Sequence, residues 1–290
     1  MAKLAFKENV DITYCECDEI NTSVTEFINN TNGNEYDLCL ITDISVNDDV
    51  AQEIDKYFSN FYLLDHHPTA LNLNKYNWCN VEIYNPINNI TTCGTELLYY
   101  WLIEHKLLEK SAVLDKFVDV VRNYDTWRWA SLGDAGIISK QINDLFYLYG
   151  QDNFINWCIS EIHDEVFPKL YAKDELILNI KQKEINEYIE EKNDDMFIGS
   201  LCQRTCGFIF ADKYVSELGN TICKMHPEID FVAIIDVNSG SISYRSVKND
   251  IDLGNNVASL FGGGGHPKAA GSSFSKDLKD KITKIIFQNE

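Results

Sequence analysis

The sequence predicts an α/β protein with two lobes: an N-terminal domain built on a parallel sheet and a smaller C-terminal α/β domain, joined by a helix. Three observations predict this class. The first seventy residues alternate as strand, helix and strand, which is the pattern of a βαβ unit. A long charged helical segment follows at residues 173–194, and the last third changes to short strands. With 290 residues, of which 45% are hydrophobic, the chain is long enough for two ordinary domains.

The elements of the first lobe follow from hydrophobic spacing. Residues 10–17 (VDITYCEC) alternate and are rich in β-branched and aromatic side chains, so they predict a strand. Residues 36–45 (YDLCLITDIS) form a nearly continuous apolar run, which is typical of a buried parallel strand. Residues 47–59 have helical spacing with acids in the first turn, and residues 61–68 (FYLLDHHP) predict a third strand.

The remaining predicted elements divide the chain into three segments. Helices are expected at residues 91–108, at 111–127 after a serine N-cap, and within 139–160. Beyond residue 196 the pattern predicts strands, a hairpin turn at "NSG" (238–240), and helices at 213–225 and 252–260. The predicted organisation is a first domain at 1–172, a linker helix at 173–196 and a second domain at 197–290.

Composition limits the classes of partner. The net charge is −20 and the sequence pI is about 4.6, whereas a protein that coats duplex DNA is normally basic. A short substrate with few phosphates remains compatible with this charge. No apolar run is long enough for a membrane span, and the first residues do not resemble a secretory signal. The nine scattered cysteines therefore indicate reduced thiols and a cytoplasmic location.

Polar residues gather at the ends of two predicted strands. Asp43 ends one strand, and Asp65, His66 and His67 end the next. Ligands of parallel sheets bind beyond the carboxyl ends of the strands, so these groups should meet. Carboxylate and imidazole ligands suit a divalent ion such as Mn²⁺, with Asp125 as a candidate third ligand, and such a centre would activate water. Taken singly, each acid could instead cap a turn, and one histidine could be structural.

A second chemical signal is the run FGGGGHPKAAG at residues 261–271. Glycine permits close backbone approach and positive φ, which can present N–H groups to an anion. The candidate substrate-binding residues here are Arg245, Gly262, Gly263, Gly264, Gly265 and His266, and Lys268 adds charge. The alternative interpretation is a flexible turn beside a surface ion pair.

Together these motifs resemble a known family. LLDHHPTA (63–70) is similar to the signature of the DHH phosphoesterase superfamily, and YRSVKNDIDLGNNVASLFGGGGHPKAAG (244–271) is similar to that of its C-terminal DHH-associated domain. The order of the motifs and the linker helix agree, over nearly the whole chain. The resemblance is greatest to the nanoRNase or oligoribonuclease-like branch. It implies a cytoplasmic hydrolase: a metal-dependent phosphodiesterase or exonuclease on short single-stranded RNA or dinucleotides.

The resemblance also implies roles for the candidate residues. Asp43 would bridge two Mn²⁺ ions, and His66 and Asp125 would bind one of them. His67 would contact the scissile phosphate while Asp65 orients the histidines, so that these two form the catalytic pair. Arg245 and the glycine run would hold the phosphate and the terminal nucleotide of the substrate.

One family motif is absent from this sequence. The family begins with a strand and a His-x-Asp-x-Asp-Gly loop, but no histidine precedes His66 here. One metal site would keep Asp43, His66 and Asp125 and the other only Asp43, so we expect at most one well-formed site. Two explanations compete: an N-terminally incomplete metal-binding domain, which we favour because the later motifs are intact, and a degenerate homologue that binds nucleotides without efficient turnover.

Other activities of the superfamily give alternative functions. A single-strand exonuclease and a cyclic-dinucleotide phosphodiesterase fit the same motifs, although the acidic charge disfavours a long basic channel. Pyrophosphatases fit less well because they do not share this form of the glycine run. Without the first strand, an exposed sheet edge would allow a homodimer.

Overall fold

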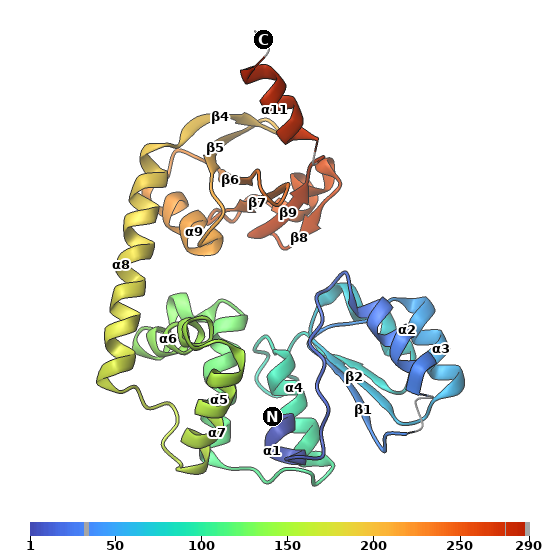
Figure 1. Ribbon diagram of the computed structural model, residues 1–290. Helices are drawn as coiled ribbons and strands as arrows, with labels where there is room; N and C mark the ends of the chain where they lie inside the picture. The colour runs from blue at the N-terminus through green and yellow to red at the C-terminus, as the bar shows by residue number, and fades with distance from the viewer. Residues whose placement is uncertain (32–34, 276, 288–290) are drawn as a thin grey trace. The chain divides into compact units, whose positions relative to one another are not determined.

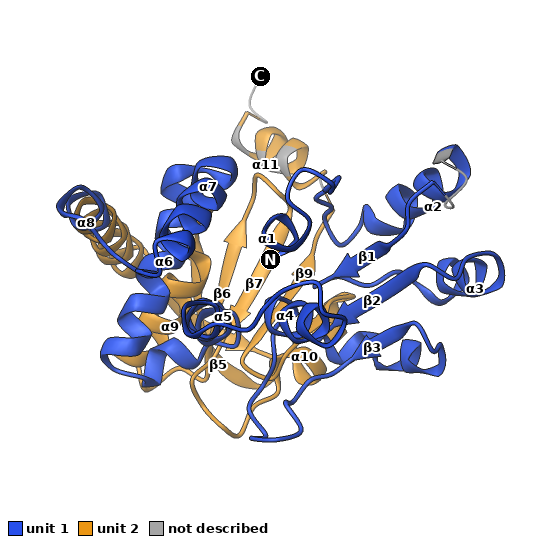
Figure 2. Cartoon of the chain, turned by 90° about the horizontal axis from the view of Figure 1, so that it is seen from below, with its two compact units in different colours: residues 1–178 blue, residues 179–290 orange. Residues whose placement is uncertain are grey.

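The computed structural model describes residues 1–31, 35–275 and 277–287, and it divides into two compact units, Met1–Leu178 and Asn179–Glu290 (Figures 1 and 2). Unit 1 holds a three-stranded parallel sheet with helices, and unit 2 holds a six-stranded mixed sheet with helices. The predicted α/β class is confirmed. The long charged segment forms one continuous helix, α8 (Ala172–Asp194), which starts in unit 1 and continues into unit 2.

The sheet of unit 1 has the strand order β1-β2-β3, and both pairings are parallel. The elements of unit 1 before α8 are α1 (Ala2–Phe6), α2 (Ile20–Thr31), β1 (Cys39–Thr42), α3 (Asp48–Tyr57), β2 (Phe61–Asp65), the 3₁₀ segment η1 (Pro68–Lys75), β3 (Cys79–Val81), α4 (Gly94–Glu104), α5 (Ala112–Asp125), η2 (Arg128–Ser131), α6 (Asp134–Tyr149) and α7 (Gln151–His163).

The two faces of this sheet have separate hydrophobic cores. Leu63 belongs to the cluster formed with α2 and α3, whereas its neighbour Leu64 packs with the leucines of α4. Successive side chains of a strand point to opposite faces, so an unbroken apolar strand must be covered on both sides. Figure 1 shows α2 and α3 on one side of β1 and β2 and α4 on the other. The predicted buried strands at 36–45 and 61–68 are thereby confirmed, with shorter bounds.

The prediction of a strand at residues 10–17 is wrong. This segment has no regular secondary structure, and its apolar residues Ile12 and Tyr14 are exposed. A strand needs a neighbouring strand for its backbone hydrogen bonds, and no described strand pairs with these residues. Helix α2 was missed by the sequence reasoning, although Ile20, Val24 and Ile28 have helical spacing and are buried.

Caps fix the helices that lead to the candidate site. The side chain of Asn47 accepts a hydrogen bond from the Val50 amide at the start of α3. Ser111 does the same for the Leu114 amide at the start of α5, as predicted. Helix α5 ends at Asp125, so Asp125 is the last residue of the helix, two residues before the predicted end at residue 127.

Unit 2 has the strand order β4-β5-β6-β7-β9-β8, in which only β5 and β6 are parallel. The predicted hairpin turn lies between β6 and β7, where Gly240 takes a φ of 74°. Strands β8 and β9, in and after the glycine run, were not predicted. The elements are β4 (Phe197–Leu201), β5 (Arg204–Phe210), α9 (Val215–Met225), β6 (Phe231–Asp236), β7 (Ser241–Arg245), α10 (Leu253–Asn256), η3 (Ala258–Phe261), β8 (Gly264–Gly265), β9 (Ala269–Ser273) and α11 (Leu278–Ile286).

Two further findings concern the environment of the chain. None of the helices within the described ranges combines the length and the apolar character that a membrane span requires. All nine cysteines are free thiols in the structure.

Candidate metal centre and substrate loop

Asp43 takes its place from the end of β1. The residue directly follows Thr42, and its backbone amide donates to the Leu64 carbonyl at 2.9 Å, so it stays beside the end of β2. Its φ is 63°, in the left-handed region that an aspartate tolerates better than most residues. This conformation turns the chain at the carboxyl edge of the sheet, where the Asp43 side chain is about half exposed.

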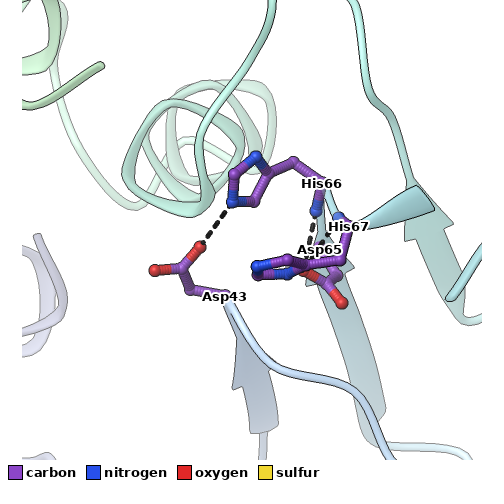
Figure 3. Close-up of side chains that lie close together, drawn as sticks. All are labelled: Asp43, Asp65, His66 and His67. Carbon is purple, nitrogen blue, oxygen red and sulfur yellow. Dashed lines mark hydrogen bonds and ion pairs between the residues drawn. The ribbon is translucent and has the colours of Figure 1, made fainter. Parts of the chain in front are cut away.

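Asp65 organises the two histidines that follow it (Figure 3). It is buried at the end of β2, and its Oδ1 accepts the backbone amides of His66 at 2.7 Å and His67 at 3.3 Å. The same oxygen lies 2.6 Å from His67 Nδ1, while Oδ2 accepts the hydroxyl of Ser45. Burial acts to raise the pKa of Asp65, but these hydrogen bonds outweigh it and lower the pKa.

His66 brings the ends of β1 and α5 together. Its Nε2 lies 3.2 Å from Asp43 Oδ1 and 3.4 Å from Asp125 Oδ2. Burial disfavours the imidazolium, yet the two carboxylates prevail and raise the pKa of His66. Burial and the nearby Asp43 charge raise the pKa of Asp125. Three potential ligand atoms, from a histidine and two aspartates, therefore converge on one position.

An overlapping group, which does not include Asp125, has the spacing of a site for a divalent cation. Asp43, Asp65, His66 and His67 each offer a ligand atom within 4.8 Å of the others. Among the described residues, no lysine or arginine forms an ion pair with Asp43 or Asp125, and the imidazole of His66 is the partner that these two carboxylates share. Burial raises the pKa of the neighbouring Cys93 thiol to about 12, and this cysteine is not part of the group. Oxygen and imidazole donors are the ligands of Mn²⁺ and similar ions.

Gly94 was not identified from the sequence, although it borders this group. It is the first residue of α4, and its amide donates to Asp43 Oδ1 at 3.2 Å. A Cβ added to Gly94 would lie 2.4 Å from that oxygen and from Asp43 Cβ. Only glycine allows the helix to approach Asp43 so closely. A glycine that opens an otherwise strong helix was the signal in the sequence.

A buried polar network fixes the helices behind the group. Arg122 Nη1 donates to Glu96 Oε1 at 2.8 Å, and Asn85 Nδ2 donates to the same oxygen at 3.3 Å. Glu96 is fully buried, and Arg122 precedes Asp125 by one turn of α5. Burial opposes the Arg122 charge, but Glu96 and Asp119 raise its pKa. The network joins the start of α4 to the end of α5, and the sequence analysis missed it because its members are far apart in the chain.

In unit 2, Arg245 lies on β7 and its guanidinium is already partly engaged. It donates through Nη1 to the Tyr244 carbonyl at 2.9 Å and through Nη2 to Ser216 Oγ at 3.2 Å. Burial lowers the pKa of Arg245, so the alternative of an exposed surface ion pair does not describe it. Gly219 of α9 makes room for the side chain, since a Cβ there would lie 2.5 Å from Arg245 Cγ.

Residues 262–266 of the glycine run pack tightly against β9. Gly262 and Gly265 have φ values of 72° and 139°, and a Cβ on Gly263 would lie 2.0 Å from the Gly271 carbonyl oxygen. The amides of Gly262, Gly263 and His266 donate to backbone carbonyls, so these three are not offered to an anion. The glycines thus serve close packing, and Gly264 has open space beside its Cα.

Lys268 is the unexpected cation of this region. Its Nζ is buried and has no hydrogen-bond partner among the described residues. Arg245 pairs with Ala269 between β7 and β9, and His266 donates its amide to the same Ala269, so the run and Arg245 share one part of the sheet. A buried ammonium without a partner favours an anion as its ligand.

Comparison with known proteins gives one extended match in sequence. The chain is 34% identical over 294 residues to the oligoribonuclease NrnB of Bacillus subtilis (strain 168), covering 99% of this chain and 72% of NrnB. No family model matches. Among solved structures, the exonuclease RecJ bound to manganese matches 97% of this chain and 79% of its own, at 12% identity and a TM-score of 0.52. The pGpG-specific phosphodiesterase PggH of Vibrio cholerae matches 99% and 92%, at 11% identity and a TM-score of 0.46.

Proposed function

The chain belongs to the DHH-family phosphoesterases, in the nanoRNase-like branch of the oligoribonuclease NrnB, and we propose that it hydrolyses the phosphodiester bonds of short oligoribonucleotides or dinucleotides. One observation supports this most directly. His66 Nε2, Asp43 Oδ1 and Asp125 Oδ2 converge at the carboxyl edge of the β1-β2-β3 sheet, where ligands of such sheets bind.

We assign the metal to these three residues, and Mn²⁺ is our choice because the similar RecJ structure is described as bound to manganese. When bound, the ion would supply an activated water and neutralise phosphate charge. The amide of Gly94 holds the Asp43 carboxylate in place by its hydrogen bond. The network of Glu96 and Arg122 holds the end of α5, and with it Asp125.

His67 is assigned to the substrate phosphate. Asp65 binds its Nδ1, which leaves Nε2 as the nitrogen available to a ligand. The hydrogen bond to Asp65 is the largest cause that raises the pKa of His67, so the cationic imidazole persists to higher pH. A cationic Nε2–H can donate to a phosphate oxygen by a charge-assisted hydrogen bond. Asp65 therefore acts as the positioning residue of the pair.

In unit 2 we assign Arg245, His266 and the glycine run to the phosphate and the terminal nucleotide of the substrate. The buried Nζ of Lys268 supports an anionic ligand in this region. The net charge of −20 supports a substrate with few phosphates. The cytoplasmic location, the homodimer and the domain boundaries of the sequence analysis stay predictions.

The test is hydrolysis of a 5′-phosphorylated diadenylate by the 290-residue chain with Mn²⁺, beside a longer RNA, a deoxy dinucleotide and a cyclic dinucleotide. We expect the short RNA to be cleaved fastest and His66→Ala to remove activity and Mn²⁺ binding. His163→Ala is the matched control, because this histidine is exposed at the end of α7. Nucleotide binding without hydrolysis in the wild type would instead support the degenerate homologue.

A further inference from the structure

Three aromatic side chains form a cluster directly after Asp125. The rings of Tyr124 and Trp129 are stacked at 6.1 Å and 14°, and Trp127 meets Trp129 edge to face at 5.1 Å. All three are partly exposed. None of them belongs to, or packs against, the hydrophobic core clusters found in the described part of unit 1. The aromatic cluster therefore lies outside these cores, although Nε1 of Trp129 is buried.

Trp127 occupies a costly backbone conformation. Its φ and ψ are 60° and 13°, the left-handed region that bulky residues rarely adopt. The conformation is held by neighbouring structure: the Trp127 amide donates to the Tyr124 carbonyl at 3.0 Å. Helix α6 packs so closely on the Trp129 backbone that a Cβ on Gly136 would lie 1.9 Å from its carbonyl oxygen. Strain that is maintained by packing points to a functional demand on the ring.

Trp127 is also close to the residues assigned to the metal, because it lies two positions after Asp125 in the chain. Only Thr126 lies between Asp125 and Trp127, so the Cα atoms of these two residues are at most about 7 Å apart. Asp125 in turn lies 3.4 Å from His66. At this distance the indole could contact a nucleobase whose own sugar carries a phosphate bound at the proposed metal site.

From these observations, and on the basis of the proposed function, we propose that Trp127 stacks on the nucleobase next to the phosphate that would lie at the metal assigned to Asp43, His66 and Asp125. Trp129 supports the Trp127 ring from its edge. Stacking accepts every base because each has a π-face, so this subsite would favour nucleotides without selecting a sequence. It would also let a chain of net charge −20 bind a nucleotide with few added phosphate contacts.

The decisive variants are Trp127→Ala and Trp127→Phe, with Tyr147→Ala as the control because Tyr147 is a 73% exposed aromatic on α6. We expect Trp127→Ala to raise KM for diadenylate roughly 5- to 150-fold with little change in kcat, from the usual contribution of one stacked base. Trp127→Phe keeps an aromatic face and should stay within a few-fold of the wild type. A methyl ester of ribose 5-phosphate lacks a base, and its cleavage should not respond to Trp127→Ala.

Fluorescence provides a readout that does not depend on turnover. Addition of adenosine 5′-monophosphate should quench tryptophan emission in the wild type and in Tyr147→Ala, and the quench should disappear in Trp127→Phe. An unchanged KM in Trp127→Ala, or an unchanged quench in Trp127→Phe, would overturn the stacking role. If the wild type quenches but hydrolyses no substrate, the stacking stands and the proposed hydrolase function fails.

Discussion

The substitution Gly94→Ala tests whether the approach of α4 sets the position of Asp43. The added Cβ would lie 2.4 Å from Asp43 Oδ1 and 2.5 Å from its Cγ, whereas non-bonded heavy atoms prefer about 3.5–4.0 Å. Asp43 or the helix must therefore shift by about 1 Å. A misplacement of this size in a reacting group can lower the rate about 100-fold. We expect that loss in kcat, with about 1–3 kcal/mol less stability from overpacking.

Combining Gly94→Ala with Asp43→Gly separates the clash between the new Cβ and the Asp43 side chain from the effect of alanine on the stability of helix α4. Asp43 has a φ of 63°, which glycine accepts without strain, and Asp43→Gly also removes the side chain that the new Cβ would strike. In this background Gly94→Ala should stabilise the protein by about 0.5–1 kcal/mol, because alanine is the better helix former. The sign of the effect on stability should thus reverse.

Urea unfolding of the four proteins gives the coupling free energy, and kcat is measured for the two that keep Asp43. Thr95→Ala, at the next position of α4, is the control and should keep its activity. We expect a coupling of about 1.5–4 kcal/mol, the difference between the two effects on stability. A coupling below about 0.5 kcal/mol, or full activity in Gly94→Ala, would refute the role assigned to Gly94.

Three further changes probe the groups around the two sites. Glu96→Gln should lower the unfolding free energy by about 3 kcal/mol because it leaves the buried Arg122 with the exposed Asp119 as its ion-pair partner, and Glu96→Leu with Arg122→Met should recover most of it in urea unfolding. In EDTA, His67→Gln should lower Tm more at pH 5.5 than at pH 8.5. The Asp65 hydrogen bond raises the pKa of His67 in the folded protein. The stabilisation from this hydrogen bond is therefore complete below the unfolded pKa of about 6.5 and is lost as pH rises through the folded pKa. Lys268→Met should raise Tm and weaken dinucleotide binding in calorimetry, since the buried Nζ has no partner among the described residues; an unchanged affinity would count against an anion there.

The sequence could predict the parts of the fold that depend on local pattern. The apolar runs that end in Asp43 and Asp65 are β1 and β2, because a strand buried on both faces must be apolar throughout. The capped helix after Ser111 and the hairpin at Gly240 are equally local features. The strand predicted at residues 10–17 failed for a non-local reason, since alternation is only a potential strand until another strand pairs with it.

The residues of the candidate site likewise include some that the sequence could predict and some that it could not. Asp43, His66 and Asp125 could be named in advance because strand ends and a family motif mark them, and the structure brings their side chains within 3.2 and 3.4 Å of each other. Gly94 and Glu96 could not, since their importance arises from tertiary contact with Asp43 and Arg122. The glycine run was only partly understood, because three amides of residues 262–266 are used by backbone carbonyls.

The acidity of the chain and its proposed substrate are compatible because of where the charges lie. The carboxylates of Asp43 and Asp125 converge on His66, so the local negative charge favours a cation and not a phosphate directly. Under the proposed function, phosphate recognition is assigned to a few cations, among them Arg245 and Lys268 in unit 2 and the imidazole of His67 in unit 1. So few cations can neutralise the phosphates of a dinucleotide but not those of a long strand, whose binding requires many phosphate contacts. Under the proposed function the balance of charge would thus restrict substrate length, and the stacking assigned to Trp127 would supply affinity that charge does not.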